Sequence, residues 1–391
     1  MGIYSEYLDR RMDINEIHRE RKRQLQRISE LRGRDIIVFA ADLNKGGKAP
    51  ISIGYDDLLP FSDQLSNLSG EKLDIILETP GGVAEVAEDI VKMIRQKYDD
   101  VAFIIPGTAK SSGTIMAMSG DDILMEPMSS LGPIDAQIVT PQGKRYSAEA
   151  LIKGIEKIKE EADRTQILSK AYIPILQGIS PGEIEEAQNA LDFAKVLVSE
   201  WLVKYKFKKW THHSSSGEPV TEEEKRLRAN EIASLLCKHE HWLSHGRSIK
   251  IEDLRKMKLI INDYSQNPEL ADAIRRYHVL MQMTFQSNIY KIFETVNSQI
   301  YRLIGNPQQQ QFQQNIESAD IKIECPQCKN VFQIQANFEP DVPLKQGRIP
   351  FPGNNQFECP KCHFIIDVSR IRNDVELKAG KKLITGRGLA R

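Results

Sequence analysis

The amino-acid sequence predicts an α/β protein with long flanking helices and a small β-rich module near the C-terminus. Three observations support this prediction: short apolar runs alternate with helix-like stretches, two turns rich in glycine or serine follow such runs, and four of the five cysteines form two close pairs. The chain has 391 residues, 40% of them apolar, which excludes a mostly disordered protein and indicates two or three domains.

Charge and the first residues of the chain bear on the class of protein. A formal net charge of −1 argues against a general nucleic-acid coat, although it is compatible with a local basic patch. No stretch approaches the roughly 18 apolar residues of a membrane span, and the arginine-rich N-terminal region has no apolar signal core. We therefore expect a cytoplasmic protein without a membrane span.

The N-terminal segment, residues 1–34, is expected to contain one long charged helix over residues 5–33. Its apolar residues form an irregular stripe: Ile14, Ile17, Leu25, Ile28 and Leu31. Such a stripe is typical of a helix that packs on a neighbouring element or on another subunit, and a helix on a membrane surface is the alternative.

The next part of the chain alternates between strand-like and helix-like segments. The predicted buried strands are Asp35–Ala40, Leu73–Glu78, Val101–Pro106 and Asp122–Glu126. The helices predicted between them are Tyr55–Leu68, Val83–Lys97 and Ser111–Ser119. This alternation indicates a mainly parallel sheet with right-handed crossovers, in which reactive residues gather at the carboxyl ends of the strands.

The remainder is expected to be mainly helical up to residue 304, where a polar Gln-rich stretch separates it from a short β-rich module. We predict five segments: an N-terminal helix (1–34), a main domain (35–265), a helical extension (266–305), a Gln-rich linker (306–318), and a terminal module with a basic tail (319–391).

Two turns at strand ends have the composition of a reactive site. In the first, Glu78–Val83 (ETPGGV), paired glycines permit a sharp turn and leave backbone N–H groups at a helix N-terminus, where they suit an oxyanion. In the second, Pro106–Thr114, Ser111 and Ser112 lie between a strand and a helix, where they are either reactive or simply helix caps. Because consecutive βα units end at the same sheet edge, we expect the turns to lie close together.

Three segments together resemble a known superfamily. ETPGG, KSSGT and DDILMEPMSSLGPIDAQI resemble the Clp/crotonase superfamily, and within it the serine dehydrogenase proteinase family, which is related to signal peptide peptidase A. The resemblance covers residues 35–205, and a weaker resemblance extends to His241–Ile249. It implies a Clp/crotonase-like core of repeated ββα units.

The resemblance also implies a function, that of a serine peptidase which forms an acyl-enzyme. The matching nucleophile is Ser111, with Ser112 as the alternative if the register is shifted by one residue. The matching oxyanion donors are the backbone N–H groups of Gly82 and Ser112. Because members of the superfamily form rings, we expect a homo-oligomer, a trimer or larger, that acts on a peptide or protein.

The general base is not fixed by the sequence. No histidine lies between His18 and His212, so the histidine of a Clp-type triad is missing from its usual place. A lysine base must be desolvated until it is neutral, and Lys153, among apolar residues, is the leading candidate. The other candidates are Lys144, Lys170, Lys195 and His245. Asp135 is expected either to orient this region or to cap a loop.

The cysteine pairs predict a metal site. Cys325 and Cys328 form one C-P-x-C pair, and Cys359 and Cys362 form the other. Two such pairs can complete a tetrahedral S4 site, so we predict a structural Zn²⁺ in a zinc ribbon. A protein or nucleic-acid partner at the ribbon, supported by the basic tail, is one hypothesis; a solvated stability module is the other.

Three functions are compatible with these features. The first is a serine endopeptidase with a suspected Ser-Lys dyad of Ser111 and Lys153. The second is a crotonase-type acyl-CoA enzyme, which uses the same oxyanion cradle without a serine nucleophile. The third is a catalytically inactive scaffold that recruits partners through the ribbon and the long helices.

Overall fold

The structure is a computed structural model that describes residues 2–139, 145–213, 216–305, 317–340, 342–379 and 382–384. It separates into two compact units, Met1–Ile304 and Gly305–Arg391, which are described separately. The predicted Gln-rich linker, 306–318, lies almost entirely outside the described residues.

The first unit is built on a mixed sheet with strand order β11-β10-β1-β2-β3-β5-β9 among the described residues. The five strands from β1 to β9 run parallel, and β10 and β11 form an antiparallel hairpin against β1. Their bounds are β1 Asp35–Ala41, β2 Lys72–Glu78, β3 Asp100–Ile104, β5 Asp122–Met125, β9 Asn262–Asp263, β10 Ile289–Glu294 and β11 Gln299–Leu303. The predicted α/β class with a mainly parallel sheet is confirmed.

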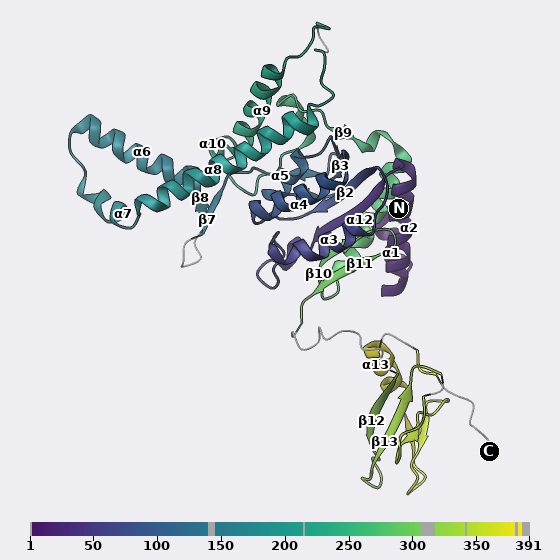
Figure 1. The fold of residues 1–391 in the computed structure, drawn as a ribbon. Helices are drawn as coiled ribbons and strands as arrows, with labels where there is room; N and C mark the ends of the chain where they lie inside the picture. The colour runs from purple at the N-terminus through teal and green to yellow at the C-terminus, as the bar shows by residue number, and fades with distance from the viewer. Residues whose placement is uncertain are drawn as a thin grey trace. The chain divides into compact units, whose positions relative to one another are not determined.

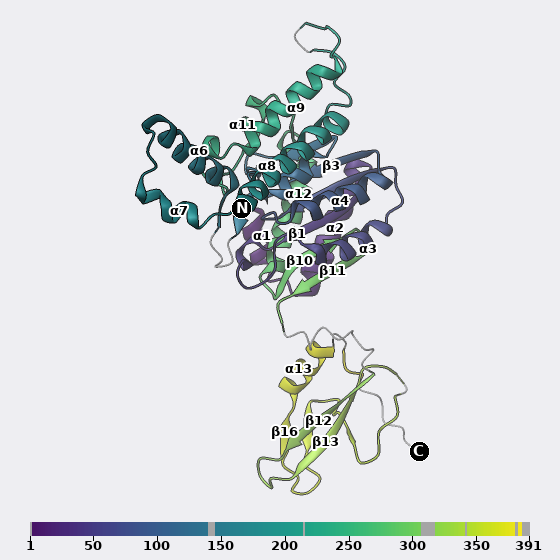
Figure 2. The same cartoon turned by 60° about the vertical axis from the view of Figure 1, so that its left-hand side comes forward.

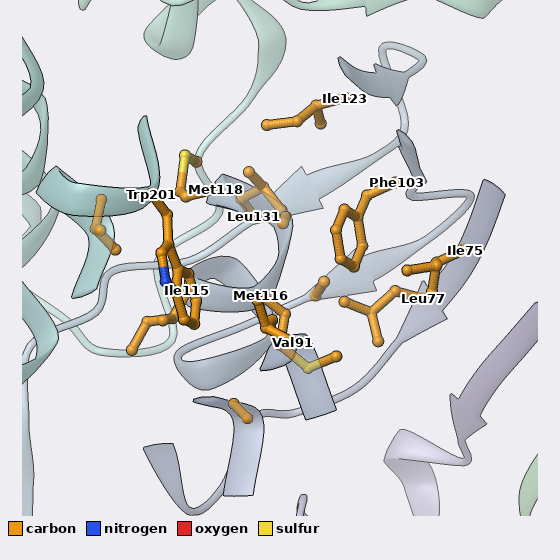
Figure 3. Packing of buried hydrophobic residues seen from close by; sticks show 14 of the residues in the cluster. Ile75, Leu77, Val91, Phe103, Ile115, Met116, Met118, Ile123, Leu131 and Trp201 are labelled. Atoms are coloured by element: carbon orange, nitrogen blue, oxygen red, sulfur yellow. The ribbon is translucent and has the colours of Figure 1, made fainter. Parts of the chain in front are cut away.

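Alternating side chains of each strand build two cores, one on each face of the sheet. In β1, Ile37 and Phe39 belong to one core, whereas Ile36 and Val38 belong to the other, as the two-residue period of a strand requires. The first core is closed by helices α3 (Leu58–Ser66), α4 (Ala84–Lys97), α5 (Ser112–Met118), α8 (Pro181–Trp201) and α9 (Glu222–Cys237). Figure 3 shows this packing.

The opposite face is covered by α2 (Ile14–Arg32) and α12 (Pro268–Phe285), as Figures 1 and 2 show. The predicted single N-terminal helix is divided into α1 (Ile3–Asp9) and α2, because Asp13 and Glu16 form a capping box that starts α2. The N-terminal helices and residues up to 304 belong to the same compact unit as the sheet.

The prediction of a helical extension over residues 266–305 is wrong in its second half. The helix ends at Phe285, and residues 289–303 form the hairpin of β10 and β11. The apolar residues Ile289, Ile292 and Phe293 have helix-like spacing in the sequence. Pairing of β10 with β1 supplies backbone hydrogen bonds at the edge of the parallel sheet and buries Ile292 and Phe293 completely.

A helical arm extends from the main body in Figure 1. It begins after the short hairpin of β7 (Gln137–Val139) and β8 (Arg145–Ser147), and contains α6 (Ala148–Thr165), a single turn Lys170–Tyr172 and α7 (Ile173–Gln177) before α8 returns. Large apolar side chains near its end are exposed: Ile167, Leu168, Ile173 and Ile175.

The second unit has its own small core. Its strands are β12 Ser318–Glu324, β13 Val331–Asn337, β14 Ile349–Pro350, β15 Gln356–Glu358 and β16 Ile365–Asp367, followed by α13 Ser369–Ala379. The strands around the cysteine pairs agree with the predicted β-rich module, whereas α13 lies where we predicted only a basic tail. Across the described part of both units, no helix has the length and apolar character that crossing a membrane requires.

Candidate active site and metal centre

Ser111 lies on a strained turn directly before α5. It is the N-cap of that helix and has φ 49° and ψ −120°, a conformation that costs a residue with a side chain about 1–3 kcal/mol. The turn is closed by hydrogen bonds from the N–H of Gly113 to the carbonyl of Lys110 (2.8 Å) and from the N–H of Thr114 to that of Ser111 (2.8 Å). Backbone strain of this kind is typical of functional sites.

The two neighbouring serines differ in accessibility. Ser111 is half-buried, whereas Ser112 is fully buried and its Oγ has no hydrogen-bond partner among the described residues. A buried hydroxyl without access to substrate cannot serve as a nucleophile without movement of the backbone. The geometry therefore favours Ser111 in the register left open by the sequence.

The glycine turn after β2 lies against the serine turn. The N–H of Thr79 donates to the carbonyl of Thr108 (2.9 Å), and the N–H of Lys110 donates to the carbonyl of Thr79 (3.0 Å). Gly81 has φ +94°, and a Cβ on it would lie 2.6 Å from the Cβ of Ser111. Only glycine fits here, because the backbone touches the serine.

Two backbone amides beside Ser111 remain free to bind an oxyanion. The N–H groups of Gly82 and Ser112 have no acceptor among the residues that the structure describes. Gly82 is held by a bridge to Ile53, whose N–H donates to the carbonyl of Gly81 (2.8 Å) and whose carbonyl accepts from the N–H of Val83 (3.0 Å). Gly82 lies just before α4 and Ser112 is the first residue of α5, so the helix dipoles favour negative charge at both amides.

A buried carboxylate with two imidazoles lies on segments adjacent to this turn. The Asp135 side chain is fully buried, its Oδ1 lying 2.7 Å from Nδ1 of His245 and its Oδ2 2.9 Å from Nδ1 of His239. Burial alone would raise the pKa of Asp135. Hydrogen bonds and charge from His245, and then from His239, outweigh it and lower that pKa. Because each Nδ1 faces the carboxylate, each Nε2 points away from Asp135 and is left to act on another group.

Lys110 fastens the segments of these residues to the serine turn. Its Nζ donates to the carbonyl of Leu131 (3.0 Å), the carbonyl of Arg247 (2.9 Å) and Oγ of Ser248 (3.1 Å). Burial lowers the pKa of Lys110 to about 8, and the charge of Lys250 adds to this effect. Sequence reasoning did not single out Lys110, and its only signal was its place next to Ser111.

Lys153, the leading candidate for the base, is engaged with two acids. Its Nζ lies 2.6 Å from Oε1 of Glu149 and 2.9 Å from Oε2 of Glu240. Hydrogen bonds to Glu149 and then Glu240 raise the pKa of Lys153, the opposite of what a lysine base requires. No contact joins Lys153 to Ser111 within the described ranges, so its role stays a prediction.

Of the other lysine candidates, the structure describes Lys170 and Lys195. Lys144 lies outside the described residues. Lys170 is exposed in the turn before α7, and Lys195 is half-buried on α8. Of the candidates for the base, His245 alone has a buried acid that orients it among the described residues.

The cysteine pairs of the second unit converge on one point. Sγ atoms of Cys325, Cys328, Cys359 and Cys362 all lie within 4.8 Å of one another, so they could hold a metal ion. The two pairs have matching backbone geometry: the residue after each second cysteine, Lys329 or His363, has φ 60° and donates its N–H to the carbonyl of the first cysteine, at 2.9 and 3.0 Å.

The segment that contains the glycine turn and the serine turn is similar to a known family. Residues 66–201 match the family described as ClpP-like SDH-type serine proteinase. This segment includes both turns and Asp135 but ends before His245. The predicted resemblance is confirmed over these residues.

Two uncharacterized proteins of Methanocaldococcus jannaschii are similar to part of the chain. One is 32% identical over 117 residues, which cover 30% of this chain and 37% of the relative. The other is 33% identical over 96 residues, which cover 25% of this chain and 32% of the relative. The chain therefore spans about a third of the length of these curated relatives.

Two solved structures also align with the chain. Both are of the 1510-N membrane-bound stomatin-specific protease, one with a serine replaced by alanine and one with a lysine replaced by alanine in complex with a substrate peptide. The first is 16% identical and covers 57% of this chain and 79% of its own; the second is 18% identical and covers 65% and 83%. Each has a TM-score of 0.33.

Proposed function

Because residues 66–201 match the ClpP-like SDH-type serine proteinases, we propose that this protein is a serine peptidase that cleaves peptide bonds through an acyl-enzyme on Ser111. The observation that carries the proposal is the pairing of two turns. A half-buried serine with φ 49° lies in contact with Gly81, beside two backbone amides that have no acceptor in the described part of the chain.

The proposed reaction is acyl transfer in two steps. Oγ of Ser111 attacks the peptide carbonyl while a base accepts its proton, and the N–H groups of Gly82 and Ser112 hold the oxyanion. The C–N bond then breaks, the amine leaves with that proton, and water hydrolyses the ester by the same route. Loss of one oxyanion donor typically lowers the rate by about 10²–10³.

We propose His245 as the base, with Asp135 as the residue that orients it. Nδ1 of His245 lies 2.7 Å from the buried carboxylate, so the imidazolium formed during attack would be stabilised. Lys110 contacts the carbonyl of Arg247 and thereby fastens the His245 segment to the nucleophile turn. Lys153 is retained as the second candidate, since release from Glu149 and Glu240 would free its amine.

The proposal for Ser111 is tested with a fluorophosphonate probe on the full chain. The wild type should be labelled at Ser111, Ser111→Ala should lose labelling completely, and the matched variant Ser112→Ala should retain it. Labelling of Ser111→Ala at the wild-type rate would remove Ser111 as the nucleophile. Absence of labelling and of peptide cleavage in the folded wild type would favour the scaffold hypothesis instead.

The two candidate bases are separated by a pair of variants. His245→Asn should slow labelling and cleavage by at least about 10²-fold, the scale of general base catalysis, whereas Lys153→Met should change them little. Asp135→Asn should act in the same direction as His245→Asn. The reverse ranking, with Lys153→Met inactive and His245→Asn active, would restore the Ser-Lys dyad.

The acyl-CoA alternative shares the oxyanion cradle but needs no serine nucleophile. A strained, half-buried Ser111 supports the peptidase, because a crotonase-type enzyme has no use for a reactive hydroxyl there. Tight binding of an acyl-CoA to both the wild type and Ser111→Ala, without peptide cleavage, would favour that alternative.

We propose that the metal held by the four cysteines is a structural Zn²⁺. Zn–S bonds of about 2.3 Å in a tetrahedron place sulfur atoms about 3.8 Å apart, and the 3.6 Å separations of Cys325 from Cys362 and of Cys328 from Cys359 support that fit. Four thiolates leave no open position, so the ion would stabilise the fold rather than take part in the reaction. Metal analysis of the purified chain should give about one zinc per chain.

The proposed homo-oligomer, a trimer or larger, is supported by the exposed apolar end of the arm. Ile167 is 72% exposed and Ile175 is 51% exposed, and a subunit contact would cover both. Light scattering should give at least three times the monomer mass, and Ile167→Ser with Ile175→Ser should reduce it. A monomeric wild type at micromolar concentration would exclude the oligomer.

We retain the cytoplasmic location, and a partner at the ribbon, as proposals.

A further inference from the structure

A cavity of about 740 Å³ lies near the N-terminal ends of the parallel strands, whereas Ser111 lies beyond their C-terminal ends. One of its lining residues, Lys206, contacts Asp122 at the beginning of β5, whereas Ser111 follows the carboxyl end of β3. Because parallel strands begin at one edge of the sheet and end at the other, this cavity cannot be a subsite of the Ser111 centre in the same chain. Its volume is that of a small-molecule site.

Lys206 supplies a buried cation with few partners. It ends a π-helical turn, Leu202–Lys206, a rare geometry that is often associated with function. Its side chain is only 5% exposed, yet Nζ reaches its two acceptors, the carbonyl of Asp121 and Oδ1 of Asp122, at 3.4 Å each. Burial lowers the pKa of Lys206, which indicates that the ammonium is poorly compensated. An additional anion in the cavity would compensate it.

Lys258 is a second cation with an unusual backbone. It lies two residues after α11 (Ile251–Lys256), directly after the C-cap Met257, and has φ +62° at a position where helices usually have glycine. A side chain in this conformation costs about 1–2 kcal/mol. Within the described ranges no carboxylate lies at ion-pair distance from Lys258. The two acids that line the cavity, Glu224 and Glu231, already pair with His213 and Arg228.

Aromatic and apolar side chains form the other wall of the cavity. The rings of Phe207 and Trp210 meet edge to face at 5.5 Å, and those of Trp210 and His213 at 5.6 Å. At the rim, Leu227 is 59% exposed and Ile260 is 78% exposed. Apolar side chains grouped in this way are typical of a surface that binds a ligand.

We propose that this cavity binds a small organic anion with an aromatic ring, its acidic group at Lys206 and Lys258 and its ring against Phe207 and Trp210. The acidic group is a carboxylate, as in an aromatic amino-acid derivative, or a phosphate, as in a nucleotide. The proposal is independent of the peptidase activity, because none of these residues belongs to the Ser111 centre.

The test is calorimetric titration of the full chain with N-acetylphenylalanine and, separately, with AMP, both without added metal. Lys258→Gly should weaken binding by about tenfold, the loss of one charge-assisted contact. Because glycine fits φ +62° without strain, this variant should be at least as stable as the wild type, so weaker binding could not be ascribed to misfolding. Lys206→Met should abolish binding while filling the same volume.

The matched control is Lys329→Gly in the second unit, which also replaces a lysine at positive φ, here 60°, but lies outside the cavity. It should leave binding unchanged. Binding of either probe supports the site, and binding of one probe alone identifies the acidic group as a carboxylate or a phosphate. If neither probe binds below millimolar concentration, or if Lys258→Gly and Lys206→Met bind like the wild type, the proposal is overturned.

Discussion

The two units of this protein build their sites in contrasting ways. In the first unit, Gly82, Ser111, Asp135 and His245 come from distant parts of the chain, and two extensive apolar cores hold them in place. In the second, two short cysteine pairs with equivalent backbone geometry meet above a small core. The difference indicates that the first site is positioned by the fold, whereas we expect the second unit to need the metal ion that its four cysteines could hold.

Removal of the metal should produce the largest effect and should separate the units. Structural zinc contributes roughly 10–16 kcal/mol in small modules, more than the small core of the second unit can replace. We expect Cys359→Ser, or a strong chelator, to unfold residues 317–384 while the sheet of the first unit persists. Hydrogen exchange followed by mass spectrometry would resolve the two units.

Labelling of Ser111 by a fluorophosphonate is the control for this experiment, because it reports on the first unit alone. It should survive removal of the metal. If labelling were lost together with the metal, the two units would depend on each other and the contrast drawn above would be wrong.

Disrupting the contact between the glycine turn and the serine turn should have the second largest effect. In Gly81→Ala the new Cβ would lie 2.6 Å from the Cβ of Ser111, so the turns must separate and the oxyanion donors must move. We expect cleavage to fall by at least about 10²-fold, the scale of one lost donor.

Gly47→Ala is the matched control for Gly81→Ala. Gly47 also has a positive φ, +82°, but a Cβ there would meet nothing within 4 Å. This variant therefore isolates backbone strain and should lower stability while leaving the cleavage rate unchanged. Equal losses of activity in both variants would show that strain, not the contact with Ser111, is responsible.

Lys110 should give the first unit a distinctive dependence on pH. Burial lowers its pKa in the folded protein to about 8 from an ordinary 10.5, so between these values the unfolded chain binds more protons. The contribution of Lys110 to the free energy of unfolding should therefore rise as pH increases from about 8 to 10.5.

Replacement of Lys110 by methionine removes this contribution. The difference in free energy of unfolding between wild type and Lys110→Met, measured by urea denaturation across that range, should grow with pH in favour of the wild type. A difference that is constant or falls with pH would contradict the lowered pKa.

The smallest expected effect is a gain of stability in the second unit. His363 has φ 60° after its cysteine pair, and its ion pair with Glu358 is exposed and contributes little. His363→Gly should raise the free energy of unfolding of the metal-bound unit by up to about 1 kcal/mol. A loss of stability would indicate that the His363 side chain has a role beyond the turn.

Much of the first unit could be predicted from short-range patterns. The predicted strands beginning at Asp35, Leu73, Val101 and Asp122 each agree with the structure to within one or two residues, because buried parallel strands are continuous apolar runs. The hairpin over 289–303 was missed because the spacing of its apolar residues also suits a helix, and only the exposed edge of β1 decides between the two.

In the candidate site, too, local motifs were predicted from the sequence and long-range contacts were not. The turns with Gly81 and Ser111 were recognisable because each is a local strand-to-helix motif. The pairing of Asp135 with His245 joins residues 110 positions apart, and no local sequence pattern predicts such a contact. Lys153 was selected because it has apolar neighbours in the sequence, and these cannot show that its amine contacts Glu149 and Glu240.

The hydrogen bonds between Thr79 and the strand at Thr108–Ala109 have a consequence for the selection of substrates. They join the glycine turn to the serine turn, so the amides of both turns should exchange with deuterium slowly and together. If the two turns do not move when substrate binds, the substrate backbone must adopt the conformation that fits them. Extended, unstructured stretches of polypeptide should therefore be cut far faster than the same residues held in a helix.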